Sequence, residues 1–155
     1  MLQVRIGQHS EAGCKAVNQD FHGARVPEGA ALAAKGVAVA LADGIGSSDV
    51  SHIASATAVR ALMDDYYSTS DAWSVRRAVH CVLQATNAWL HAQSLRGPHR
   101  FDRDRGHVCT LSALVLKAAT AHLFHVGDAR ICRVQGRGLE QLTEDHRVHL
   151  EGRSY

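Results

Sequence analysis

The chain has 155 residues, of which 46% are hydrophobic, so it is long enough to fold as one domain with an apolar core. Its 17 basic and 15 acidic residues give a formal net charge of +2, and 5% of the residues are aromatic. This balance lacks the basic excess of nucleic-acid-binding proteins. Because the chain also lacks a long apolar stretch and the layout of a signal peptide, we expect a cytoplasmic protein with neither nucleic-acid nor membrane partners.

The cysteines and histidines do not follow metal-ligand or disulfide patterns. The four cysteines, Cys14, Cys81, Cys109 and Cys132, are far apart and form no C-x-x-C pair. This spacing argues against a disulfide framework and a zinc knuckle, and predicts buried free thiols. The eleven histidines are scattered without the spacing of a zinc site, which is typical of surface positions.

The amino-terminal third predicts strands. Residues 2–6 alternate between apolar and polar side chains, which favours an edge strand, and a loop follows to Gln19. Residues 20–26 have a weaker strand pattern, and residues 27–29 form a turn. Residues 36–42 are a continuous run of small apolar side chains, which predicts a fully buried central strand ending at Asp43.

The middle of the chain predicts two long helices. From Val50, apolar side chains recur at helical spacing, at Ile53, Ala54, Thr57, Ala58, Ala61 and Leu62. A second stripe runs from Val75 to Leu90 after capping candidates at Ser70, Asp71 and Ser74, and it stops at Arg96-Gly97-Pro98. The polar segment 98–107 has no periodicity and predicts a surface loop.

The last third predicts strands again, over residues 109–116, 121–126 and 129–134, with a tight turn at 135–138. This succession favours an antiparallel meander. Strands, two adjacent helices and further strands indicate an α+β layered architecture rather than alternating βαβ units. We expect one domain over residues 1–155.

Asp43 and Gly44 are the most informative pair for chemistry. A carboxylate at the end of a buried strand suits hard cations such as Mg²⁺ or Mn²⁺, and a glycine leaves its carbonyl open to the same ion. Asp-Gly is also a common turn dipeptide. A third interpretation is a nucleotide site in which Gly44-Ile45-Gly46 cradles a phosphate, but Asp49 replaces the third glycine of that motif and the parallel βαβ context is absent.

Two other aspartates lie at comparable positions. Asp20 stands at a loop-to-strand junction, and Asp128 lies between two apolar strands beside Arg130, where it forms either a structural ion pair or part of a site. Three such carboxylates together favour a two-metal site, because hydrolysis of a phosphate ester there needs clustered carboxylates and a metal-bound water.

Five motifs in order resemble the metal-dependent protein phosphatases of the type 2C family. They are Gly13-Cys14-Lys15-Ala16-Val17-Asn18-Gln19-Asp20, Ala42-Asp43-Gly44-Ile45-Gly46-Ser47, Cys109-Thr110-Leu111, His125-Val126-Gly127-Asp128-Ala129-Arg130 and Leu142-Thr143-Glu144-Asp145-His146. The chain resembles bacterial members, which usually have Asp-Gly-Met-Gly-Gly at the second motif. The resemblance implies a layered β-sandwich flanked by paired antiparallel helices.

The resemblance also implies an activity: hydrolysis of phosphoserine and phosphothreonine in proteins, with two Mn²⁺ or Mg²⁺ ions and a third, weaker one. Asp43 matches the aspartate that bridges the two metals, Gly44 the glycine whose carbonyl contacts one of them, and Asp20 the acidic residue of the first motif. Asp128 matches the aspartate associated with the third ion. Lys15 stands where the family has an arginine that grips the substrate phosphate, and it lacks the bidentate fork. Gln19 replaces a more usual glutamate, and Thr110 matches a structural threonine.

The chain departs from the family pattern at its end. The family has two further metal-binding aspartates beyond the point that matches His149, whereas this sequence stops at Tyr155. We therefore expect a fold incomplete at the carboxyl end, the amino-terminal part of a longer protein, with poor metal binding and with self-association of the isolated chain. A fused or partner protein kinase is compatible with the resemblance. The alternative is a catalytically incomplete regulatory or phosphoprotein-binding module.

Overall fold

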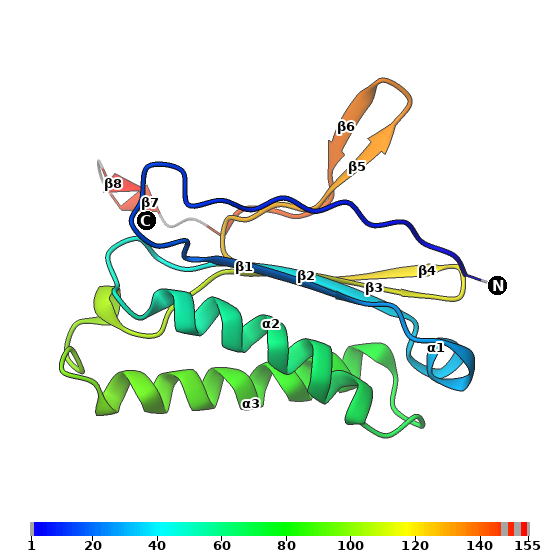
Figure 1. Ribbon diagram of the computed structural model, residues 1–155, viewed down its shortest axis with the longest axis horizontal. Coiled ribbons are helices and arrows are strands. Elements are labelled where there is room, and N and C mark those ends of the chain that lie inside the picture. Colours follow the sequence, from blue (N-terminus) through cyan, green and yellow to red (C-terminus); the bar gives the residue numbers. More distant parts are fainter. Residues whose placement is uncertain (1, 147–148, 151–152, 155) are drawn as a thin grey trace.

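A four-stranded antiparallel sheet with two long helices on one face forms the body of the protein, as the computed structural model shows (Figure 1). The structure describes residues 2–146, 149–150 and 153–154. The sheet order is β1 (Asp20–Arg25), β2 (Val37–Asp43), β3 (Leu111–Lys117) and β4 (Thr120–Val126). Helices α2 (Ser51–Ser68) and α3 (Val75–Arg96) lie side by side, and the short helix α1 (Gly29–Lys35) lies at one end of the sheet. The predicted α+β layered fold is confirmed.

The other face of the sheet carries the amino-terminal segment and a projecting hairpin (Figure 1). The hairpin consists of β5 (Cys132–Gln135) and β6 (Gly138–Gln141), and β7 (His149–Leu150) pairs with β8 (Arg153–Ser154). Val134 and Leu139, which pair across the hairpin, are 75% and 74% exposed. These open apolar side chains support the expected self-association, which stays a prediction.

The core lies between the sheet and the two helices. In β2 the side chains of Ala38, Ala40 and Ala42 are buried against the helices, because alternate residues of a strand share one face. Their small size lets α2 approach closely, and it packs Val59 and Leu62 into this layer. No helix in the described part of the chain is long and apolar enough to cross a membrane.

Several predicted strands differ from the structure. Residues 2–6 form no strand, because an extended segment can alternate in polarity without pairing in a sheet. The strand β2 is central but not fully buried, since Leu41 is 44% exposed on the face opposite the helices. The predicted meander is divided, because β4 and β5 belong to different sheets.

The helices largely match their predictions. Helix α3 has the predicted bounds at both ends, and Ser74 caps it by accepting a hydrogen bond from the Arg77 amide. Segment 98–107 is a loop with one short 3₁₀ turn, Arg103–Arg105. Helix α1 was not predicted, because its seven residues are too few for a periodic pattern to emerge.

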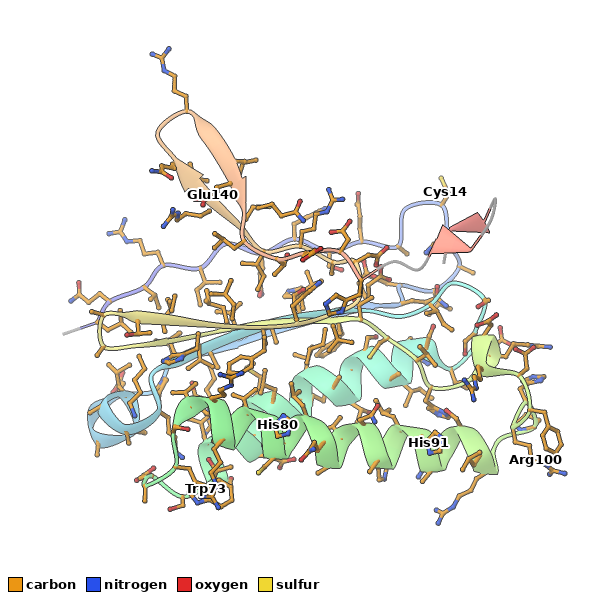
Figure 2. All side chains as sticks on the ribbon, turned by 180° about the vertical axis from the view of Figure 1, so that it is seen from behind. Cys14, Trp73, His80, His91, Arg100 and Glu140 are labelled. Atoms are coloured by element: carbon orange, nitrogen blue, oxygen red, sulfur yellow. The ribbon has the colours of Figure 1, made fainter. Side chains whose placement is uncertain are left out.

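The prediction of buried thiols is wrong for three of the four cysteines. Cys14, Cys81 and Cys132 are exposed, and Cys14 lies in the amino-terminal loop (Figure 2). Each occupies a loop, an outer helix face or the hairpin, and composition does not reveal those positions. Cys109 is half-buried, and burial raises the pKa of its thiol to about 11. The expectation that the fold is incomplete at Tyr155 falls on residues outside the described range.

Lys35 joins α1 to the connection between α2 and α3, although it is only 3% exposed. Its ammonium donates to the carbonyls of Thr69 (2.7 Å) and Ser70 (2.9 Å) and to the Thr69 hydroxyl (2.8 Å), and the Asp71 carboxylate lies 3.5 Å away. A buried charge is tolerated only with such partners.

Lys35→Met should therefore lower the free energy of unfolding by about 3 kcal/mol, because it keeps the aliphatic chain but removes the donor from the acceptors of Thr69 and Ser70. Urea denaturation measures this change. Lys117→Met is the matched control, and we expect it to shift stability by less than about 0.5 kcal/mol. Equal effects of the two substitutions would show that the buried ammonium contributes nothing specific.

Candidate active site

Asp20 and Asp43 lie directly opposite each other on the paired strands β1 and β2. On its other side, Asp43 is held by Thr110. The Thr110 amide donates to the Asp43 carbonyl (2.8 Å), and the Asp43 amide donates to the Thr110 hydroxyl (3.1 Å). Asp43 is therefore held by β1 on one side and by Thr110, the residue before β3, on the other. These hydrogen bonds agree with the structural role that the resemblance implies for Thr110.

The turn after Asp43 is tightly packed around Gly44. A Cβ at this position would lie 2.8 Å from the Gln19 carbonyl oxygen and 2.8 Å from the Ser51 carbonyl oxygen, so a larger residue would displace backbone. The Gly44 amide donates to the Gln19 carbonyl (3.0 Å), and the Ile45 amide donates to the Val108 carbonyl (3.3 Å). Because these amides are already engaged, the structure gives no support to a phosphate cradle formed by Gly44-Ile45-Gly46.

Gln19 holds this turn against the start of α2. Its side-chain amide nitrogen donates to the carbonyls of Ser48 (2.9 Å) and Ile45 (3.3 Å) and to the Ser51 hydroxyl (2.8 Å). The backbone carbonyl of Gln19 also accepts from the Ser55 hydroxyl at 2.6 Å. Sequence reasoning missed this role. Two serines four residues apart on an otherwise apolar helix face, both fully buried, are the signal that could have indicated a buried polar partner.

The electrostatics of the site centre on Asp43. Burial, together with a hydrogen bond and the charge of Asp20, raises the pKa of Asp43 to about 6. The charge of Asp128 also raises it, and the charge of Lys15 lowers it. Two carboxylates this close favour sharing a proton, which is the arrangement that a divalent cation would stabilise in the proton's place.

The structure thus places three of the predicted residues, Asp20, Lys15 and Asp128, close enough to Asp43 to change its pKa. Gly44 follows Asp43 directly in the chain. Asp20 and Asp43 form a pair, while Lys15 and Asp128 act on Asp43 through their charges. The described residues contain no group of three His, Cys, Asp or Glu side chains placed to hold one metal ion. The Asp20 and Asp43 carboxylates are therefore the type of ligand that a hard cation prefers. They are fewer than the oxygen ligands of a complete coordination shell.

The loop that carries Asp128 is anchored from the far side. The Arg130 guanidinium binds the Asp145 carboxylate through both oxygens, at 2.6 to 3.2 Å. The His146 amide donates to the Gly127 carbonyl at 2.8 Å. The fourth and fifth sequence motifs are thus joined, and they position the segment that contains Asp128.

Comparisons with solved structures agree with this arrangement. The serine/threonine phosphatase PstP/Ppp of Mycobacterium tuberculosis is 25% identical with a TM-score of 0.63, and the match covers 86% of this chain and 50% of that one. PppA of Pseudomonas aeruginosa is 24% identical with a TM-score of 0.67, covering 90% and 55%. Stp1 of Staphylococcus aureus is 17% identical with a TM-score of 0.71, covering 95% and 58%. The chain therefore spans between half and three fifths of these proteins.

No curated protein matches the chain. The family model described as protein phosphatase 2C, however, matches residues 8–152, which is nearly the whole sequence. Together with the order of the five motifs and the shared fold, this match shows that the chain belongs to the protein phosphatase 2C family.

Proposed function

We propose that the chain contributes to a metal-dependent phosphatase that hydrolyses phosphoserine and phosphothreonine in proteins. The observation that carries the proposal is the Asp20 and Asp43 pair, held at the ends of two paired strands with the pKa of Asp43 raised to about 6. A pair of this kind is the oxygen-donor arrangement that Mn²⁺ or Mg²⁺ prefers. Family membership supports the same reaction class.

Four of the site residues would hold the metal ions, and Lys15 would bind the substrate. Asp43, Asp20, the Gly44 carbonyl and Asp128 would hold the ions. When bound, such ions supply a Lewis acid and a water activated for attack on phosphorus. Lys15 would bind the phosphate oxygens, since its charge already acts on Asp43. An ammonium does this as a point charge without a bidentate fork.

A Lys15 series tests this assignment by phosphopeptide hydrolysis with Mn²⁺ and with an EDTA control. Lys15→Arg should lower KM by restoring the two-pronged grip on phosphate, and Lys15→Ala should raise KM about tenfold. Equal kinetics for all three proteins would remove Lys15 from the phosphate site. Activity that survives EDTA would remove the metal from the mechanism.

A binding module without turnover is the second candidate. It is favoured by the described residues, which contain no group of three His, Cys, Asp or Glu side chains placed to hold one metal ion. The same experiment separates the two functions, because such a module would bind phosphopeptide in a Lys15-dependent way and release no phosphate.

A further inference from the structure

A cavity of about 390 Å³ lies between the loop before β1 and the start of α2, and one of its lining residues, Lys15, acts on Asp43 through its charge. Its volume falls near the lower end of the range for small-ligand sites, so it suits a short extended segment rather than a folded surface. The lining residues with polar groups are Lys15, Gln19, Ser48, Asp49 and His52.

Most of these polar groups already have partners. The Gln19 amide is committed to Ser48 and Ser51. The Ser48 hydroxyl donates to the Gly106 carbonyl (2.8 Å) and accepts from the Val50 amide (3.2 Å). The Asp49 carboxylate lies 3.8 Å from the Arg105 guanidinium, which offsets its charge.

Lys15 and His52 are the lining residues whose side chains can still bind a ligand. Within the part of the chain that the structure describes, neither side chain has a hydrogen-bond or ion-pair partner. His52 lies in the first turn of α2, a helix whose first turn contains no acidic residue and whose start has no side-chain cap. The amino-terminal end of a helix favours negative charge, so the part of the cavity next to His52 favours an anion.

Resting on the proposed phosphatase function, we propose that this cavity selects substrates with an acidic side chain next to the phosphorylated residue, and that His52 contacts that acidic side chain. Lys15 then contacts the phosphate, and His52 faces the flanking carboxylate. Asp49 does not oppose this arrangement, because Arg105 lies against it. His52 is thus a specificity-determining residue of the reaction.

Three phosphopeptides that differ only in the flanking residue, Glu, Ala or Lys, test the proposal. The readouts are kcat/KM with Mn²⁺ and the Kd of each peptide without metal, both with the full chain. The Glu peptide should be preferred over the Lys peptide about fivefold, as one exposed polar contact to a carboxylate allows. In His52→Gln this ratio should fall towards one, and in His52→Glu it should invert.

The matched control is His80→Glu, the same substitution at an exposed position on α3 (Figure 2). It changes the net charge equally, so it should leave the ratio between peptides as in the wild type. An inverted ratio in His80→Glu as well would mean that overall charge, and not the cavity, selects the peptide, which overturns the proposal.

The two readouts separate failure of this inference from failure of the proposed function. Peptide binding with a His52-dependent preference for Glu but no phosphate release would support the proposed role of the cavity and contradict the proposed phosphatase activity. Hydrolysis with equal kcat/KM for all three peptides would support the phosphatase activity and contradict the proposed role of the cavity. Absence of both binding and hydrolysis would reject both.

Discussion

Asp43→Asn should lower phosphopeptide turnover with Mn²⁺ by at least about 100-fold, the largest effect that we expect from any single substitution. Asparagine has nearly the same size but no negative charge, and Asp43 is the carboxylate of the proposed site that lies between Asp20 and Thr110. The neighbouring Asp20 would then lose the partner that shares its proton or its cation.

Electron paramagnetic resonance of Mn²⁺ gives a second readout that does not depend on turnover, since bound and free ion give different signals. We expect weak binding to the 155-residue chain and none to Asp43→Asn. Asp64→Asn is the control, because Asp64 is exposed on α2 beside Arg25. Wild-type Mn²⁺ binding and turnover in Asp43→Asn would exclude Asp43 from the site.

Gly44→Ala should destabilise the protein by about 3 kcal/mol and lower Tm by about 10 °C, whereas Gly46→Ala, two residues later, should have almost no effect on stability. A Cβ on Gly44 would meet the backbone of Gln19 and Ser51 at 2.8 Å, and backbone cannot rotate out of the way. A Cβ on Gly46 would meet nothing closer than the Gln19 side-chain oxygen at 3.9 Å, which is ordinary contact.

Thermal unfolding followed by circular dichroism measures both variants under one condition. The two substitutions are chemically identical and lie two residues apart, Gly44 in a bridge to Cys109 and Gly46 in the following turn, so they share one local control. A Tm for Gly44→Ala within 2 °C of the Gly46→Ala value would contradict the close approach of Gln19 and Ser51 to this turn. It would also weaken the argument that the turn holds Asp43 rigidly.

The sequence was informative where one local pattern dominates. Helix α3 matches its predicted bounds because apolar side chains repeat at helical spacing between a serine cap and a Gly-Pro stop. The strands β1 to β4 were found for the same kind of reason. The five motifs identified the family before any contact was known, because their order and spacing record a shared chain path.

Contacts between distant segments were beyond the reach of local patterns. Lys35 looks like an ordinary surface lysine, yet the connection between α2 and α3 closes over it and makes it a buried donor. The cysteines are the converse case, because burial was predicted for them and three are exposed. A residue's average preference for burial says nothing about which side of α3 faces the solvent at Cys81.

For the candidate site, sequence motifs were enough to predict the residues: Lys15, Asp20, Asp43, Gly44 and Asp128. That Asp20 lies opposite Asp43 became known from the fold, because antiparallel register pairs residues that are 23 positions apart in the chain. The fold also decided that Gln19 is a donor to carbonyls and that Lys15 and His52 share a cavity. A local pattern encodes secondary-structure propensity and which side of an element is apolar. Shifted pKa values, hydrogen bonds between distant segments and cavities instead depend on which groups the packing brings within a few ångströms of each other.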